Sequence, residues 1–341
     1  MDNQRTPRSF STGGTVKRDT RQQQQKLVVI LICIVIALLL VVFMTIIGTK
    51  IVLTLTGGHQ NADPSAVEYE EVTVDRTQTL YGPLAIVNET HEYEFPDKAA
   101  ANLVKIWNYR NAHTEEGDYP AYKISYPELI LVDGAALPSL HNFLTDFSDA
   151  TKQTNTIVTS AYRTYEEQKS FQVTEGKSDH HTGFGVTLKL NDDGIVLNIY
   201  DNPEYYAWLS ENAHKYGFVP RYPEDKANIT GISNYVEYFH YVGYAPAAYM
   251  KANNLCLEEF VAGIKSYSVD DPLKVTDANG QNWLIYYAAC PGDMATIKLP
   301  TNFTYTVSGD NEGGIIVCVS LSKAAFEQQQ QQESESDSAA Q

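Results

Sequence analysis

Three short groups of polar side chains between residues 156 and 243 have the types and spacing of a binding or catalytic site. They are Ser160–Arg163 with Gln168 after it, Ser178–Gly183, and Glu237–His240. Arginine binds carboxylates through paired N–H groups, and histidine is a common metal ligand. For each side chain the alternative is a structural role, such as a hydrogen-bonded loop histidine or a buried arginine bound to backbone carbonyls.

Predicted helices and short strands alternate around these groups and place them at element junctions. Leu137, Leu140, Phe143, Leu144 and Phe147 recur at helical spacing, which predicts an amphipathic helix over residues 137–152. Other helices are predicted at 165–173, 201–216, 245–254 and 257–264, and strands at 156–159, 183–190, 195–199 and 238–242, with a hairpin turn at 191–194. This mixture predicts an α+β fold.

After about residue 268 the pattern changes to short strand-like runs separated by turns. They cover residues 273–275, 283–288, 295–299, 303–307 and 314–320, and predict a small β-rich module over 266–322. Cys290 and Cys318 lie in this module. They either pair as a disulfide outside the cell or stay as two reduced buried thiols, with Cys256 left over.

An uncharged apolar run from Leu27 to Thr49 predicts a membrane helix, because about 20 apolar residues span a bilayer. The run is longer than the apolar part of a cleaved signal peptide and has no small-residue cleavage pattern after it. Six basic residues precede it within residues 1–26. The positive-inside rule therefore puts this tail in the cytoplasm and the later residues outside. A stalk over 50–79 and a disordered tail over 323–341 are predicted from composition.

The charge balance excludes a general nucleic-acid binder. The chain of 341 residues has a formal net charge of −17, and the part after residue 26 holds 19 basic and 40 acidic side chains. Binding to phosphate backbones needs clustered lysine and arginine.

Residues 80–265 resemble the VanY-type D-alanyl-D-alanine carboxypeptidases in the order and spacing of the three polar groups. The resemblance implies helices packed on a small antiparallel sheet (a VanY-like, hedgehog-like peptidase core), and a zinc enzyme that trims peptidoglycan stem peptides. In the family two zinc ligands come from Ser-x-His-x-x-Gly-x-Ala-x-Asp, and the base and third ligand from Glu-x-x-His. The predicted anchor agrees with a cell-wall substrate at a bacterial plasma membrane.

Part of the family's site is retained. Arg163 matches the arginine that holds the terminal carboxylate, and the resemblance places Ser160, Tyr162, Gln168 and Ser178 around the substrate. His180 matches the first zinc ligand. Gly183 is kept, whereas Gly185 stands at the alanine position.

The other zinc positions are replaced. Thr187 occupies the aspartate position, and an ungapped alignment puts Tyr235 at the glutamate base and Tyr238 at the histidine ligand. A neutral hydroxyl and two phenols with pKa near 10 are poor substitutes. This alignment disfavours a bound zinc ion and a working base.

An alignment shifted by two residues keeps the catalytic motif. Glu237-Tyr238-Phe239-His240 itself reads Glu-x-x-His, and a slip of two in a strand keeps side chains on the same face. A bulge would then bring Glu237 in as base and His240 as zinc ligand. The missing carboxylate would have to come from Asp179, Asp192 or elsewhere.

Two functions follow. The ungapped alignment predicts a non-catalytic, membrane-tethered domain that binds peptides ending in D-Ala-D-Ala or a cell-wall enzyme. The shifted alignment predicts an active zinc D,D-carboxypeptidase that releases terminal D-Ala. A third hypothesis gives the main role to the β-rich module as an interaction domain.

Overall fold

The computed structural model describes residues 61–94, 102–115, 120–127, 130–171 and 174–322. The predicted basic tail, transmembrane helix and C-terminal tail lie outside the described residues. Within the described part, no helix combines the length and apolar character needed to cross a membrane.

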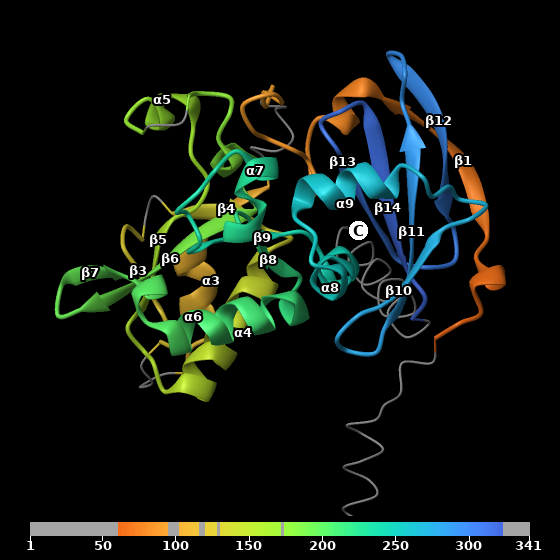
Figure 1. Cartoon of the computed structure of the whole chain (residues 1–341). Helices are drawn as coiled ribbons and strands as arrows, with labels where there is room; N and C mark the ends of the chain where they lie inside the picture. Colours follow the sequence, from red (N-terminus) through yellow and green to blue (C-terminus); the bar gives the residue numbers. More distant parts are fainter. Residues whose placement is uncertain (1–60, 95–101, 116–119, 128–129, 172–173, 323–341) are drawn as a thin grey trace, which may run out of the picture. The chain divides into compact units, whose positions relative to one another are not determined.

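A six-stranded sheet runs through the region that contains the polar groups (Figure 1). Its order is β3 (Lys123–Ile124), β5 (Thr156–Ser160), β6 (Gly185–Asp192), β9 (Tyr238–Tyr241) and β8 (Phe218–Pro220), and β7 (Ile195–Asn198) also pairs with β6. Only β3 and β5 are parallel among these pairs. Because side chains alternate along a strand, Leu188 and Leu190 of β6 enter the core while Thr187 and Lys189 share the other face.

Helices cover the core face of this sheet. α4 (Leu137–Thr151) confirms the predicted amphipathic helix and contacts α3 (Ile106–Ala112) and α6 (Pro203–Asn212). Phe143 of α4 packs against the rings of Phe218 and Phe239 from the sheet. The predicted helix at 201–216 is α6 followed by a 3₁₀ turn that ends at Gly217, whose φ is +77°.

A separate pair of strands and two single-turn helices accompany the sheet. β2 (Leu103–Lys105) and β4 (Leu131–Asp133) form a separate antiparallel pair. The helix predicted at 165–173 is only the single turn α5 (Tyr165–Gln168), which begins at a capping box between Thr164 and Glu167. α7 (Ala227–Thr230) is also one turn long and ends at Gly231, with φ +74°.

The C-terminal part contains all the predicted β-runs. β10 (Leu273–Thr276), β11 (Asn282–Ala289), β14 (Gly314–Ser320) and β13 (Tyr305–Gly309) form one sheet in that order, and β12 (Met294–Pro300) pairs with β1 (Tyr69–Asp75). β1 lies inside the segment predicted as a stalk, so that prediction is wrong there. Its alternating residues bring Val74 onto a cluster with Ile297 and Val317, a contact between distant parts of the chain.

The β-rich part is not an independent module. α8 (Tyr244–Asn253) and α9 (Leu257–Ile264) share an apolar cluster with β10, β11 and β14, in which Phe260 and Ile264 meet Ile285 and Ile316. Cys256, Cys290 and Cys318 are buried free thiols. The two cysteines of the β-rich part therefore follow the reduced alternative, and burial raises the pKa of Cys318 to about 12.

Candidate functional site

The polar groups surround a cavity of about 600 Å³ over the Thr187 face of the sheet. The end of β5, the turn after it, β6 and the segment before β9 form its walls. The lining residues are Thr159, Ser160, Arg163, Gln168, Phe171, Ser178, His180, Thr187, Lys189, Tyr222, Ile232, Ser233, Asn234 and Tyr235. Of the substrate-binding residues predicted from the sequence, only Tyr162 does not line it.

Arg163 presents an uncompensated positive charge to this cavity. Its Nε donates to Ser160 Oγ at 3.0 Å, and its Nη1 to Gln168 Oε1 at 3.4 Å. The guanidinium carbon lies 3.7 Å from the centroid of the Phe171 ring. No described carboxylate forms an ion pair with it. Neutral partners hold the side chain in place and leave donors for an anionic ligand.

The charge of the lining contrasts with that of the chain. The chain has 42 acidic side chains, yet none of the described lining residues is acidic. Lys189 is the second cation of the lining, but its Nζ lies 2.5 Å from Glu237 Oε1. The cavity therefore offers one net positive charge, at Arg163, which suits a single carboxylate.

His180 is held as a neutral imidazole. Its Nδ1 lies 2.5 Å from the backbone oxygen of Ala161, and its Nε2 lies 2.8 Å from the hydroxyl of Tyr235. A carbonyl only accepts, so Nδ1 carries the proton and Nε2 accepts from Tyr235. Burial, together with the charge of Arg163, lowers the pKa of His180 to about 3.

Tyr235 links His180 to Thr187. The two hydroxyl oxygens lie 2.7 Å apart. Because the Tyr235 proton points to His180, Thr187 donates to Tyr235, and a three-residue hydrogen-bonded chain results. Burial raises the pKa of Tyr235, although Thr187 and Arg163 partly offset this rise. Tyr235 is therefore a protonated donor at neutral pH and not a base.

Tyr238 faces away from the cavity. Its hydroxyl donates to Asp179 Oδ2 at 3.0 Å inside the protein. A Cβ at position 185 would lie 1.9 Å from this hydroxyl, so the larger ring fits only because Gly185 replaces alanine. Two departures from the family motif, at 185 and 238, are thus coupled by packing.

A buried charge network anchors the turn that carries His180. Asp179 accepts from Arg221 Nε at 2.9 Å and from His240 Nδ1 at 2.6 Å, and all three side chains are fully buried. Arg221 also forms a forked pair with Glu258 of α9. Burial opposes charge on Asp179, but His240 and Arg221 hold its pKa below its usual range.

The shifted alignment does not describe this arrangement. Glu237 pairs with Lys189, and the two ring nitrogens of His240 contact Asp179 and, at 3.0 Å, the backbone oxygen of Pro83. β6 and β9 pair with Thr187 opposite Tyr238 and Gly185 opposite His240. In this register Glu237 and His240 are bound to partners other than His180. Asp192 lies in the β6–β7 hairpin.

The donors at His180 do not fit zinc. A catalytic zinc site takes three protein ligands from histidine, cysteine and carboxylate side chains. Here one imidazole faces a threonine hydroxyl and a protonated phenol. Among the described residues, no group of three or more His, Cys, Asp or Glu side chains is placed to hold a metal ion. Asp179, the adjacent carboxylate, is saturated inside the protein.

Several lining residues escaped the sequence analysis. Lys189 could have been predicted, because residues two apart in a strand share a face and Lys189 lies two residues after Thr187. Phe171 had no local signal, because it reaches the cavity through a loop. The ring of Tyr235 is nearly parallel to the rings of Tyr222 and Tyr238. Its centroid lies 5.9 Å from that of Tyr222 and 5.2 Å from that of Tyr238.

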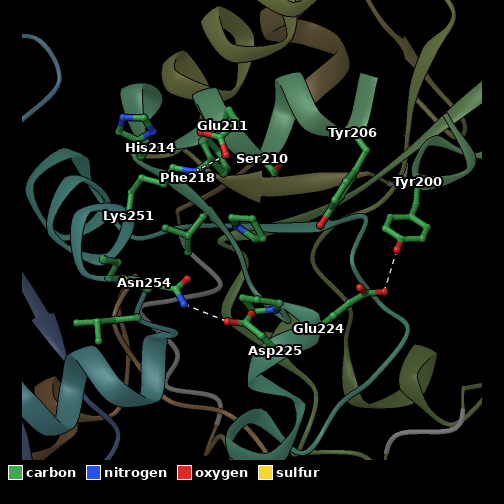
Figure 2. A pocket seen from close by; sticks show the side chains of 15 residues that line it. Tyr200, Tyr206, Ser210, Glu211, His214, Phe218, Glu224, Asp225, Lys251 and Asn254 are labelled. Atoms are coloured by element: carbon green, nitrogen blue, oxygen red, sulfur yellow. Dashed lines mark hydrogen bonds and ion pairs between the residues drawn. The ribbon is translucent and has the colours of Figure 1, made fainter. Parts of the chain in front are cut away.

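A second cavity of about 450 Å³ lies between α6, β8 and α8 (Figure 2). Its carboxylates have partners: Glu224 accepts from Tyr200, Asp225 from Asn254, and Glu211 pairs with Lys251. Glu211, Glu224 and Asp225 are exposed to solvent. The arrangement shows no convergent set of free polar groups.

We expect acid to destabilise the protein through His180. The unfolded histidine has a pKa near 6.5 and the folded one about 3, so only the unfolded state takes up a proton in this window. The contribution of His180 to the free energy of unfolding is complete above pH 6.5 and falls by about 1.4 kcal/mol per pH unit below it. Denaturant unfolding measured across this pH range should show a smaller slope of unfolding free energy against pH for His180→Gln than for wild type. His91→Gln is the control, and an unchanged slope for His180→Gln would contradict the expectation.

Comparison with known proteins shows that this chain is similar to one family. The family model described as VanY, D-alanyl-D-alanine carboxypeptidase, matches residues 131–244. A D-alanyl-D-alanine carboxypeptidase of Enterococcus faecium is 28% identical over 262 residues, 73% of this chain and 79% of that protein. One from Enterococcus faecalis is 39% identical over 95 residues, 28% of this chain and 34% of that protein.

A solved structure has the same fold. The vancomycin-resistance D,D-dipeptidase VanXYg, crystallised with a D-Ala-D-Ala phosphinate analogue, superposes with a TM-score of 0.60 at 26% identity, over 74% of this chain and 99% of that one. The chain is therefore similar in sequence and fold to the VanY-type D-alanyl-D-alanine carboxypeptidase family.

Proposed function

We propose that this protein is a membrane-anchored, extracytoplasmic member of the family that binds peptides ending in D-Ala-D-Ala and does not cleave them. The bound form would be the uncleaved stem peptide of peptidoglycan. A cell-wall enzyme is the alternative partner.

The hydrogen-bonded chain Thr187–Tyr235–His180 carries the proposal. It fills three positions where the family has two zinc ligands and the base. Each hydrogen bond satisfies a polar group that would otherwise be free to hold a metal or a water. No described carboxylate lines the cavity, so a general base for water attack is missing from these residues.

The retained Arg163 and the residues that hold it support ligand binding. Arg163 is pre-positioned by Ser160, Gln168 and Phe171, and its charge is uncompensated. A terminal carboxylate accepts two parallel hydrogen bonds from a guanidinium group, which selects a free C-terminus over an amide.

The alternative is an active zinc D,D-carboxypeptidase. The names of the relatives favour it, because the matched enterococcal proteins are carboxypeptidases. The donor set at His180 and the positions of Glu237 and His240 disfavour it.

The location rests on the sequence. The apolar run over 27–49 and the basic residues before it support a single-pass anchor with the C-terminal part outside a bacterial plasma membrane. Placement outside the membrane would bring the cavity to the cell wall.

The test uses the full chain in detergent and an acetylated peptide ending in D-Ala-D-Ala. We expect calorimetry to detect binding, and a D-Ala assay to detect no release, with or without added zinc. The same peptide with a C-terminal amide should bind at least about tenfold more weakly, because it lacks the charge that Arg163 recognises.

The outcomes separate peptide binding, catalysis and binding of a protein partner. Repeated turnover that needs zinc would establish the enzyme and overturn the proposal. Absence of binding by either peptide would remove the peptide ligand and leave a protein partner.

A further inference from the structure

The hydrogen-bonded chain Thr187–Tyr235–His180 has a fixed direction. Nδ1 of His180 donates to the backbone oxygen of Ala161, and Nε2 of the same ring accepts the Tyr235 proton. The Thr187 proton then goes to the Tyr235 oxygen, 2.7 Å away. All three protons of the chain are used within the cavity wall. This part of the wall therefore offers a ligand lone pairs and no donor.

Thr187 keeps the most acceptor capacity in this chain. A hydroxyl oxygen has two lone pairs, and Tyr235 is the one described side chain that hydrogen-bonds with the Thr187 hydroxyl. Thr187 is the donor in that bond, so both of its lone pairs stay available. The residue lines the cavity and is only 4% exposed. Because an unpaired buried acceptor costs free energy, a ligand that brings a donor is favoured here.

A β-bulge brings Thr187 close to the side chain that holds Arg163. The register of β5 against β6 shifts between Val158 and Ser160, and as a result Ser160 lies opposite Thr187. Directly opposite residues have Cβ atoms about 4.5–5.5 Å apart. Ser160 Oγ also accepts from Arg163 Nε at 3.0 Å. Thr187 and Arg163 are therefore joined through a single residue.

Tyr235 forms a second link between the same two residues. Its hydroxyl contacts Thr187, and the charge of Arg163 is close enough to offset part of the rise in the pKa of this phenol. All three residues line one cavity. The guanidinium donors, which suit an anion, thus lie near an oxygen acceptor, which suits an N–H group.

The C-terminal residue of a peptide carries both matching groups. Its carboxylate and its amide N–H are attached to the same Cα atom, so one residue presents an anion and a donor close together. With the carboxylate at Arg163, the N–H of that residue is the donor nearest to Thr187. The carbonyl of the same peptide bond is only an acceptor, so it cannot pair with the lone pairs of Thr187.

We propose that Thr187 is a specificity-determining residue that accepts a hydrogen bond from the amide N–H of the ligand's last residue. The site then selects a C-terminal amino acid joined by an amide bond and discriminates against the corresponding ester. This inference rests on the proposed function and deepens it, because it concerns the same ligand in the same cavity.

The experiment compares an acetylated peptide ending in D-Ala-D-Ala with an analogue that has an ester oxygen in place of the last N–H. We expect calorimetry with the full chain to show that the amide binds at least about tenfold more tightly, because the ester leaves a buried acceptor unpaired. Thr187→Val has nearly the same shape without the acceptor, so it should bind both ligands equally weakly. Thr187→Ser keeps the oxygen and should keep the preference.

Thr159 provides the matched control. Its hydroxyl also lines the cavity, and it donates to the backbone oxygen of Thr187 at 3.4 Å. It is the competing acceptor, but it is less buried than Thr187. Thr159→Val should therefore keep the ratio of amide to ester affinity. Loss of the preference in Thr159→Val, with the preference retained in Thr187→Val, would overturn the assignment.

A second ligand removes the N–H and keeps the amide carbonyl. Methylation of the last backbone nitrogen should weaken binding to wild type, as the ester does. An N-methyl amide that binds as tightly as the parent peptide would overturn the inference. Both ligand analogues test the wild-type chain, so these results do not depend on how Thr187→Val folds.

The outcomes separate this inference from the proposed function. Equal binding of amide and ester by wild type would leave the peptide ligand in place and overturn the role of Thr187. The same preference in wild type and in Thr187→Val would have the same meaning. If neither ligand binds, the peptide ligand itself is wrong, and the role of Thr187 is overturned with it.

Discussion

Arg221→Met is expected to lower the free energy of unfolding by about 3–5 kcal/mol, the usual cost of removing one partner from a buried ion pair. Arg221 is fully buried and holds two carboxylates, Asp179 and Glu258. Without it, the described partners left to the fully buried Asp179 side chain are His240 and Tyr238. Urea unfolding measured by circular dichroism gives the change directly.

A surface pair serves as the matched control. Lys251 and Glu211 lie 2.9 Å apart, with side chains 36% and 70% exposed, so Lys251→Met should cost less than about 1 kcal/mol. Asp179→Asn added to Arg221→Met should recover part of the loss, because it removes the stranded charge. A change below about 1 kcal/mol for Arg221→Met would show that the network contributes little.

Arg163→Met is expected to weaken binding of the D-Ala-D-Ala peptide about ten- to hundred-fold, because a charge-assisted hydrogen-bonded pair is lost. Stability should change little, since the described partners of Arg163 are a hydroxyl, an amide and an aromatic ring. Calorimetric titration of the full chain measures the affinity, and thermal unfolding checks the fold.

Two comparisons make this result specific. Arg163→Lys keeps the charge but not the planar fork, and should bind with intermediate affinity. The amide-capped peptide should bind wild type and Arg163→Met equally weakly, because both changes remove the same contact. Additive losses would mean that Arg163 acts on another part of the ligand.

Local sequence patterns determined most elements of the site's scaffold. The spacing of Leu140, Phe143 and Phe147 was sufficient for α4, because the period of an amphipathic helix is a property of one segment. The Asn191–Gly194 turn likewise predicted the β6–β7 hairpin, since its chemistry is local. α5 ends earlier than predicted because periodicity marks the boundary of a short helix poorly.

Long-range packing decided the rest of the fold. The segment over residues 69–75 was predicted as stalk, yet it is β1, because its partner β12 lies more than two hundred residues away in the chain. The helices α8 and α9 were predicted, but the packing of their apolar faces on β10, β11 and β14 was not. In both cases the local sequence does not show which distant strand packs against it.

The sequence by itself determined the family resemblance and the candidates Arg163 and His180, because these residues lie in motifs with fixed spacing. An ungapped alignment also predicted that Thr187, Tyr235 and Tyr238 stand at the replaced positions. Only the tertiary structure decided what those replacements do. Strand register set β9 against β6 with Thr187 opposite Tyr238, which leaves Glu237 with Lys189 and His240 with Asp179. Side-chain direction and protonation depend on such neighbours, and a sequence does not specify them residue by residue.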